Sequence, residues 1–162
     1  MNDIYAFLKD NNIAYERFDH PAVFTCEEAK ELCPPMPGCS IKNLFLYDSR
    51  SGQHFLVVIS EDKRIDLKKL KDLLNVSKLS FGSEERLKEY LGVEPGSVTI
   101  LGLMNDTGHA VRVIFDQQIW GQPLQSHPLI NTATLVIQPQ DVEAFLKATG
   151  HSYEVIDIQS RE

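Results

Sequence analysis

An apolar segment near residue 44 dominates the hydrophobic pattern of the chain. Residues 44–47 read Leu-Phe-Leu-Tyr and are followed by the turn-rich residues 49–52, which predicts a strand covered on both faces. Two polar residues, Lys42 and Asn43, occupy the first half of this segment. Because side chains alternate along a strand, Lys42 and Asn43 are expected on opposite faces.

The lysine in this strand requires a physical reason. Burying an ammonium group without a partner costs several kcal/mol, which is comparable to the net stability of a domain. Lys42 therefore either reaches solvent from the mouth of the strand, with its stem on the core, or lines a pocket that holds an anion or a polarised carbonyl. The pattern leaves both interpretations open.

The rest of the pattern predicts helices and strands in irregular alternation. Caps, amphipathic spacing and glycine stops predict helices that begin after Asn2 or Asp3, at Thr25, after Asp66, after Ser83 and at Pro139. Apolar and β-branched runs predict a short strand from Ile13 that runs to His20, and further strands over residues 54–59, 96–102, 111–116 and 132–137. Because only a short turn precedes it, the 54–59 strand is expected to form an antiparallel hairpin with the 44–47 strand.

These elements predict an α+β fold, with helices packed around a mixed, curled sheet. In the helix after Asp66, the expected inward positions are Leu67, Leu70, Leu73 and Leu74. We expect a single domain over residues 1–162, because the sequence shows no internal repeat, low-complexity tract or linker.

Composition is that of a soluble globular protein, with 43% apolar and 24% charged residues. The amino terminus lacks the basic and apolar blocks of a signal peptide, and no run of apolar residues is long enough to cross a membrane, so we expect a cytoplasmic protein. The spacings of Cys26, Cys33 and Cys39 lack close CxxC pairs, and we interpret all three as reduced thiols.

Charge is distributed unevenly along the chain. The formal net charge of −7 argues against indiscriminate binding to nucleic acid. Residues 63–78, however, hold six basic and two acidic side chains, so that this segment carries +4 and the remainder −11. The segment is either a solvated helix face or a local surface for phosphates.

Familiar catalytic signatures are missing: the sequence contains no GxSxG, GxxxxGK[ST], HExxH or strand-linked GxGxxG motif. Among five histidines, His127 stands out because Pro123 and Pro128 stiffen its loop just before a predicted buried strand. His127 either braces that loop or serves a site, and the other four histidines are interpreted as surface or structural. A Cys39 nucleophile paired with His127 is a weaker alternative, because nothing marks a lowered thiol pKa.

Five ordered motifs carry a resemblance that spans nearly the full chain. They are His20 to Thr25, Lys42 to Leu46, Leu79 to Ser83, Pro95 to Thr99 and Ser126 to Thr134. Together they resemble the YbaK and prolyl-tRNA synthetase editing-domain family, and most of all its free-standing alanyl-tRNA(Pro) deacylases of the ProX type.

The resemblance implies a trans-editing enzyme, an aminoacyl-tRNA hydrolase that removes a wrongly attached small amino acid from tRNA(Pro). It implies cleavage of alanyl-tRNA(Pro), with cysteinyl-tRNA(Pro) or another small misacylated residue, or a catalytically silent tRNA- or synthetase-binding module, as alternatives. Relatives often carry a proline where this chain has Ile100, so the preferred amino acid is left open. The implied partner is the tRNA(Pro) acceptor stem, with prolyl-tRNA synthetase as a further candidate, and no membrane, DNA, cofactor or metal is implied.

The resemblance also assigns roles to residues. Lys42 would stabilise charge on the ester or hold the terminal nucleotide, Asn43 would complete the polar rim after a twist or bulge, and His127 would orient the aminoacyl group. The substrate's own ribose 2′-hydroxyl would help to activate water. The implied substrate-binding residues are Gly96, Ser97, Gly102 and Ser126, and the implied tRNA-binding residues are Lys63, Arg64, Lys68, Lys69, Lys71 and Lys78.

Overall fold

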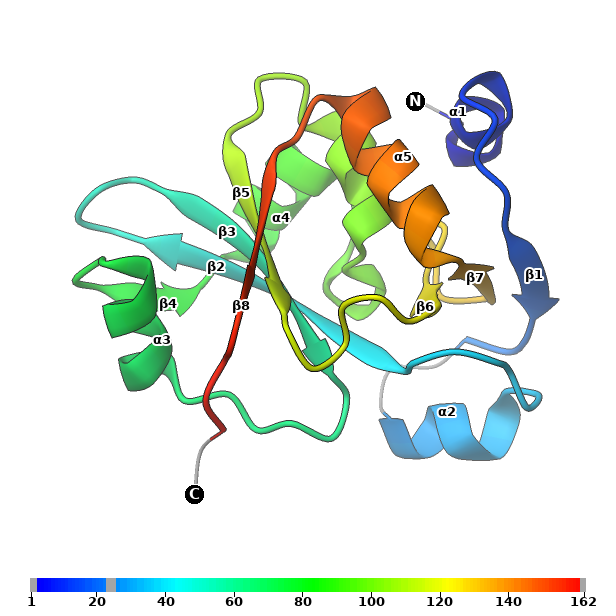
Figure 1. Cartoon of the computed structure of the whole chain (residues 1–162), viewed down its shortest axis with the longest axis horizontal. Helices are drawn as coiled ribbons and strands as arrows, with labels where there is room; N and C mark the ends of the chain where they lie inside the picture. The colour runs from blue at the N-terminus through cyan, green and yellow to red at the C-terminus, as the bar shows by residue number, and fades with distance from the viewer. Residues whose placement is uncertain (1–2, 23–25, 161–162) are drawn as a thin grey trace.

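The computed structural model describes residues 3–22 and 26–160 and confirms the predicted α+β class. Its strands are β1 (Glu16–Asp19), β2 (Ile41–Asp48), β3 (His54–Ser60), β4 (Leu79–Phe81), β5 (Val111–Asp116), β6 (Leu124–Ser126), β7 (Ala133–Ile137) and β8 (Tyr153–Ile156). They form a five-stranded mixed sheet of order β4-β2-β3-β5-β8 and a three-stranded antiparallel sheet of order β1-β7-β6, where the pattern predicted one curled sheet (Figure 1).

The predicted hairpin is confirmed: β2 and β3 pair antiparallel in one continuous register, from Ile41 opposite Ser60 to Tyr47 opposite His54. The register contains no bulge, so of the twist or bulge expected at Asn43, the bulge is absent. β5 and β8 extend the sheet in parallel from β3. The strands β4, β6 and β8 were not predicted, because each is only three or four residues long and shows too little alternation.

The helices are α1 (Ile4–Asp10), α2 (Cys26–Leu32), α3 (Leu67–Leu74), α4 (Glu84–Leu91) and α5 (Pro139–Thr149). The predicted caps are confirmed for α3, where Asp66 accepts two backbone N–H groups, and for α4, where Ser83 accepts one. The predicted start of the second helix, Thr25, lies outside the described residues. The inward position of Leu73 is wrong: this side chain is half exposed, because Leu70 and Leu74 already cover the sheet.

Residues 96–102 do not form a strand. They span two 3₁₀ helices, η1 (Pro95–Ser97) and η2 (Ile100–Asn105), and the two residues between them. The Thr99 side chain accepts the N–H of Leu101 and so caps η2. The first five residues of η2 are all buried, and a short, continuously apolar run of this kind cannot be distinguished from a strand by its pattern.

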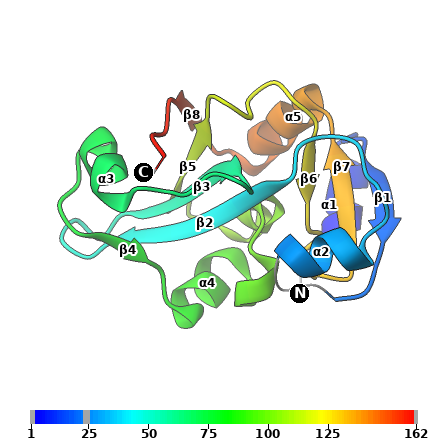
Figure 2. The same cartoon turned by 90° about the horizontal axis from the view of Figure 1, so that it is seen from below.

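Both faces of the large sheet are covered. Figure 2 shows α3 on one face and α4 on the other, with the small sheet at one end of β2. Leu46, Val57 and Leu70 belong to the core cluster on the α3 side. Phe45, Val58 and Leu91 belong to the larger cluster on the α4 side, which also includes residues of the small sheet. No helix within the described residues is long and apolar enough to cross a membrane.

Candidate active site

The candidate site lies at the outer edge of β2, in a stretch that neighbouring strands leave uncovered. At one end of this stretch, Gly82 N–H donates to Phe45 O at 2.9 Å, which is where the pairing with β4 ends. At the other end, Cys39 N–H donates to Pro123 O at 2.7 Å beside β6. Because backbone groups two residues apart face the same edge, those of Asn43 point outward between β4 and β6. No described strand pairs with Asn43 on this side.

Lys42 and Asn43 point to opposite faces of β2, as alternation predicts. Lys42 is half-buried on the face of Leu44, and its ammonium has no carboxylate partner within the described part of the chain. Asn43 lies on the α4 face, where its Oδ1 is buried and finds no hydrogen-bond donor among the described residues. Buried amide oxygens are normally hydrogen-bonded, so an unpaired one at a sheet edge is a candidate for contact with a ligand.

A hollow opens at this edge. Its volume of about 310 Å³ is at the lower end of the usual range for small-ligand sites. Its wall includes Asn43 and Leu44 from β2, Phe81 from β4, and Pro95 and Val98 around η1. Lys42 is not part of this wall, but it directly precedes two of the residues that are.

His127 approaches the same stretch from the opposite side. Cys39 and Leu124 form a parallel bridge, and Lys42 and His127 each lie three residues beyond it, so both segments lead toward the uncovered edge. The Nδ1 atom of His127 lies 3.2 Å from the carbonyl oxygen of Ala133. Because a carbonyl can only accept, Nδ1 carries the proton, and a neutral ring leaves Nε2 as a free acceptor.

Burial lowers the pKa of His127 from its ordinary value of 6.5, and the nearby His20 lowers it further, although the bond to Ala133 opposes both effects. The His20 and His127 rings meet edge to face, with centroids 6.3 Å apart. His20 is itself tied by both nitrogens, at 2.9 Å to Pro21 O and 2.8 Å to Thr134 Oγ1. His20 therefore braces the ring of His127, which the sequence did not reveal.

The loop around His127 carries two further signs of a functional position. Ser126 is 2% exposed, and its Oγ has no hydrogen-bond partner among the described residues. Leu129 has φ of 69°, a left-handed conformation that is strained for a branched side chain. Such strain clusters at active sites and ligand clamps.

The resemblance places three residues of the 96–102 segment near the ester. They differ in how far the fold already uses their backbone N–H groups and the space around them. Gly102 N–H already donates to Thr99 O, and a Cβ at Gly102 would lie 2.9 Å from Leu91 O, so this glycine is needed for packing against α4. Ser97 is buried, and its N–H donates to Glu94 O. Gly96 lies between Pro95 and Ser97 in η1, beside the hollow.

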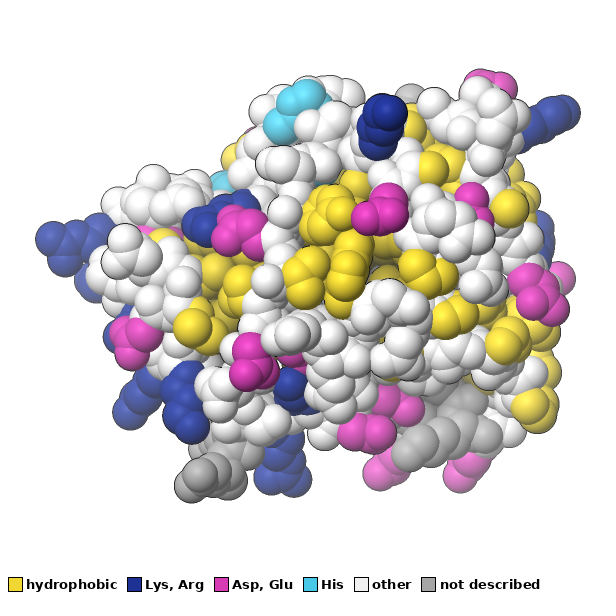
Figure 3. Space-filling model, viewed as in Figure 1, with side chains coloured by type: hydrophobic (Ala, Val, Ile, Leu, Met, Phe, Trp, Pro, Cys, Tyr) yellow, Lys and Arg dark blue, Asp and Glu magenta, His cyan; other side chains and the backbone are white. Residues whose placement is uncertain are grey.

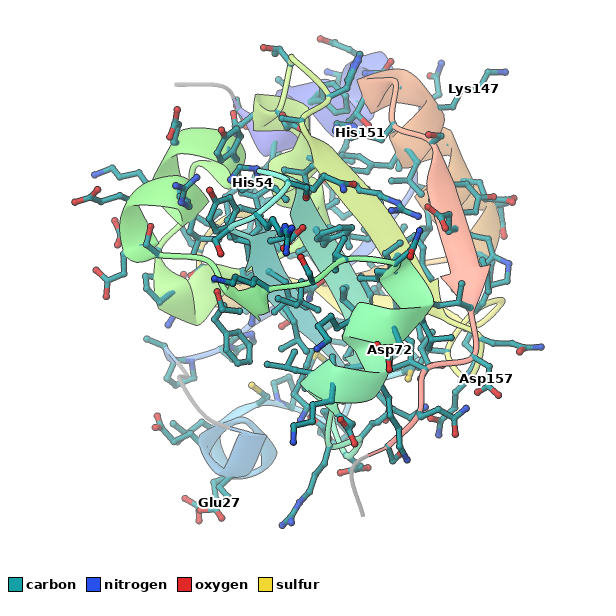
Figure 4. All side chains as sticks on the ribbon, turned by 90° about the vertical axis from the view of Figure 1, so that its left-hand side faces the viewer. Glu27, His54, Asp72, Lys147, His151 and Asp157 are labelled. Atoms are coloured by element: carbon teal, nitrogen blue, oxygen red, sulfur yellow. The ribbon has the colours of Figure 1, made fainter. Side chains whose placement is uncertain are left out.

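The other histidines have structural surroundings. His54, labelled in Figure 4, is 4% exposed. Its Nε2 accepts from Arg86 Nη1 at 3.1 Å, and its ring centroid lies 4.2 Å from that of Tyr90. His151 is 6% exposed and lies 2.8 Å from Asp106 Oδ2. These contacts account for both side chains within the fold.

Most of the basic side chains of residues 63–78 are exposed, and Lys63 is the exception. Lys63 is only 12% exposed, pairs with the fully buried Asp116, and donates to Ile158 O at 2.9 Å, so it anchors the end of the chain instead of facing solvent. The exposed basic side chains are Arg64, Lys68, Lys69 and Lys78, and Lys71 is half-buried. Figure 3 shows dark blue side chains at the left and lower left, where α3 lies.

The alternative of a cysteine nucleophile loses support. Burial raises the pKa of the Cys39 thiol, and Glu61 and Asp62 raise it further, so the thiolate is disfavoured. Cys33 and Cys39 are both free, as predicted. Among the described residues, no group of three or more histidine, cysteine or acidic side chains could hold a metal ion.

Comparisons with known proteins identify relatives of this chain. A ProX prolyl-tRNA editing protein of Acetoanaerobium sticklandii is 38% identical over 156 residues, covering 96% of this chain and 95% of the relative. A proline–tRNA ligase of Bacillus velezensis is 32% identical over 107 residues, which cover 65% of this chain and 18% of the ligase. A solved protein provisionally described as a trans-editing enzyme for prolyl-tRNA synthetase has a TM-score of 0.69 and 18% identity, covering 98% of this chain and 96% of that one.

The strongest finding concerns the family as a whole. The profile of the aminoacyl-tRNA editing domain matches residues 20–145, a range that contains the uncovered edge of β2, the hollow and the His127 loop. The chain therefore belongs to the aminoacyl-tRNA editing domain family.

Proposed function

We propose that this protein is a trans-editing deacylase that hydrolyses alanyl-tRNA(Pro) to alanine and tRNA(Pro). The observation that carries the proposal is the uncovered edge of β2, where the unpaired Oδ1 of Asn43 and the outward backbone groups adjoin a small hollow. Similarity to a ProX prolyl-tRNA editing protein over nearly the full length of both chains supports the same reaction and substrate. Because aminoacyl-tRNA is used in translation, the proposed enzyme acts in the cytoplasm. Prolyl-tRNA synthetase is a candidate partner.

The proposed chemistry needs no protein nucleophile. Water attacks the ester carbonyl carbon, the bond to the ribose oxygen breaks, and that oxygen leaves with a proton. The neighbouring 2′-hydroxyl helps to activate the water, while the ammonium of Lys42 stabilises negative charge that develops on the ester. His127, neutral and held by Ala133, offers Nε2 as an acceptor that orients the aminoacyl group.

Discrimination follows from the size of the hollow. A synthetase pocket shaped for proline cannot exclude the smaller alanine, because each missing methylene is worth only about 1–3 kcal/mol. A second, tighter site can reject proline by bulk. Pro95 and Val98 line the hollow together with Asn43, and they are the proposed wall that excludes the proline ring.

The decisive measurement is single-turnover hydrolysis of alanyl-tRNA(Pro) compared with prolyl-tRNA(Pro). We expect cleavage of the alanyl ester at least about tenfold faster, as expected for a difference of one to two methylenes. Lys42→Ala should lower the rate about 100-fold without changing the thermal unfolding midpoint, because Lys42 is half exposed and has no carboxylate partner in the described chain. A fully active, folded Lys42→Ala variant would remove this lysine from the mechanism.

Two outcomes would redirect the assignment. Faster cleavage of cysteinyl-tRNA(Pro) than of alanyl-tRNA(Pro) would make cysteine the proposed target. Salt-dependent binding of tRNA without any hydrolysis would identify a silent binding module and would contradict the proposed enzyme.

A further inference from the structure

Phe81 occupies an unusual position at the end of β4. It pairs directly opposite Leu46, yet its side chain is 58% exposed. An exposed phenylalanine forgoes roughly 1.5–3 kcal/mol of burial and, on an edge strand, invites association with other molecules. The packing of the protein gives no reason for this exposure, which points to a ligand.

Two hollows meet at this ring. The first is the hollow of about 310 Å³ at Asn43, and the second, of about 550 Å³, is lined by residues 65–68 at the start of α3. Phe81 lines both hollows, so it lies where the two adjoin. A ligand that covers the ring can therefore reach into both.

The two hollows differ in chemistry. The first offers the unpaired Asn43 Oδ1 but also the carboxylate of Glu84, which disfavours a phosphate there. The second offers the exposed Lys68, while the carboxylate of Asp66 is engaged in capping α3. Lys69 and Arg64 lie next to it on the basic segment. The order across the ring is thus polar acceptor, aromatic face and cation.

A nucleotide presents groups in the matching order. Its sugar hydroxyls and ester suit the first hollow, its base suits an aromatic face, and its phosphate suits the lysines. We propose that Phe81 is a stacking platform for a base of the unpaired 3′ end of the tRNA, with the phosphate on the α3 side and the aminoacylated sugar on the Asn43 side. This inference rests on the proposed function, because it assumes an aminoacyl-tRNA at the β2 edge.

The test uses the full-length protein and an RNA minihelix of the acceptor stem, either with its unpaired 3′ nucleotides or without them. Wild-type protein should bind the complete minihelix more tightly, and Phe81→Ala should weaken that binding and raise the KM for alanyl-minihelix roughly 5- to 100-fold. Phe81→Trp should retain affinity, because it keeps a stacking face. Leu73→Ala on α3, which removes another exposed apolar side chain, is the control and should bind as wild type does.

The outcomes separate the two proposals. If wild-type protein fails to hydrolyse alanyl-tRNA(Pro), the proposed function fails whatever Phe81 does. If wild type hydrolyses it but Phe81→Ala keeps the wild-type preference for the complete minihelix, the stacking proposal is overturned. A change in oligomeric state by gel filtration, with unchanged RNA affinity, would also overturn it, since Phe81 would then contact a second copy of the chain.

Discussion

At the scale of single residues, the site depends on polar groups that the fold leaves incompletely satisfied. Asn43 Oδ1 and Ser126 Oγ are buried without a hydrogen-bond partner among the described residues, and each such group costs about 1–3 kcal/mol. A substrate that bonds to them recovers this cost. His127 is arranged differently, since one nitrogen is fixed by Ala133 O and the other is left for a ligand.

The titration of His127 gives a prediction at this scale. Because burial and His20 lower its pKa in the folded protein, its NMR titration midpoint should lie below 6.5, and this titration should disappear in His127→Asn. The unfolded chain then binds the proton more readily, so the contribution of His127 to stability is complete above about pH 6.5 and is lost as the pH falls through the folded pKa. His127→Asn should also lower hydrolysis about tenfold through the lost hydrogen bond.

His109, which is exposed, provides the control for assigning the signals. Its replacement by asparagine should leave both the His127 signal and hydrolysis unchanged. A midpoint for His127 at or above 6.5 would contradict the neutral, orienting role that the contact with Ala133 supports.

At the scale of elements, the sequence predicted the pieces that repeat a regular pattern. The hairpin of β2 and β3 and the caps at Asp66 and Ser83 follow from alternation and from side chains that satisfy free N–H groups. The short strands β4 and β6 escaped prediction, although they define the two ends of the uncovered β2 edge. Their pairing depends on residues far away in sequence, which a local pattern does not contain.

The strand predicted over residues 96–102 was wrong for a different reason. Its glycines suggested a strand with close backbone approach to a substrate, but Gly102 is required by α4, because a Cβ would lie 2.9 Å from the carbonyl oxygen of Leu91 and 3.0 Å from its Cβ. The same residue type can serve a ligand or a neighbouring helix. Only the packing of η2 on α4 distinguishes the two.

Gly102→Ala is therefore predicted to destabilise the protein. The added methyl group forces η2 away from α4 and should lower the free energy of unfolding by about 1–3 kcal/mol, measured from urea transitions. Gly108→Ala is the matched control, because no atom lies within 4 Å of the added Cβ and its φ is not in the left-handed region. The free energy of unfolding of Gly108→Ala should be unchanged or about 0.4–1 kcal/mol higher. Equal effects of the two substitutions would refute the packing role.

At the scale of the whole molecule, the site lies where the two sheets meet. β2 belongs to the large sheet and β6 to the small one, and the Cys39–Leu124 bridge brings their ends together. Lys42 and His127 were singled out from the sequence, but their approach follows from this bridge between segments 85 residues apart. Phe81 falls within the Leu79 to Ser83 motif, but the sequence indicated no role for it, because its exposure beside the hollow is a property of the fold.

Charge is also a property of the whole surface. The chain carries −7 overall, yet α3 and its flanks present exposed cations beside the hollow lined by residues 65–68. Phosphates are therefore attracted to this region and repelled elsewhere. Lys147 is exposed on α5, which lies apart from α3 in the upper part of Figure 1, and so provides a lysine outside this region.

Binding of tRNA should therefore weaken with salt in a way that depends on α3. Each phosphate contact contributes about 0.7–0.9 to the slope of log affinity against log salt concentration, so Lys68→Gln combined with Lys69→Gln should reduce the slope by roughly 1–2. Lys147→Gln should leave the slope unchanged, because Lys147 lines neither of the two hollows. If Lys147→Gln, which removes one charge, reduced the slope by half as much as the double variant, tRNA would respond to net charge alone, and α3 would then no longer define the acceptor-stem surface.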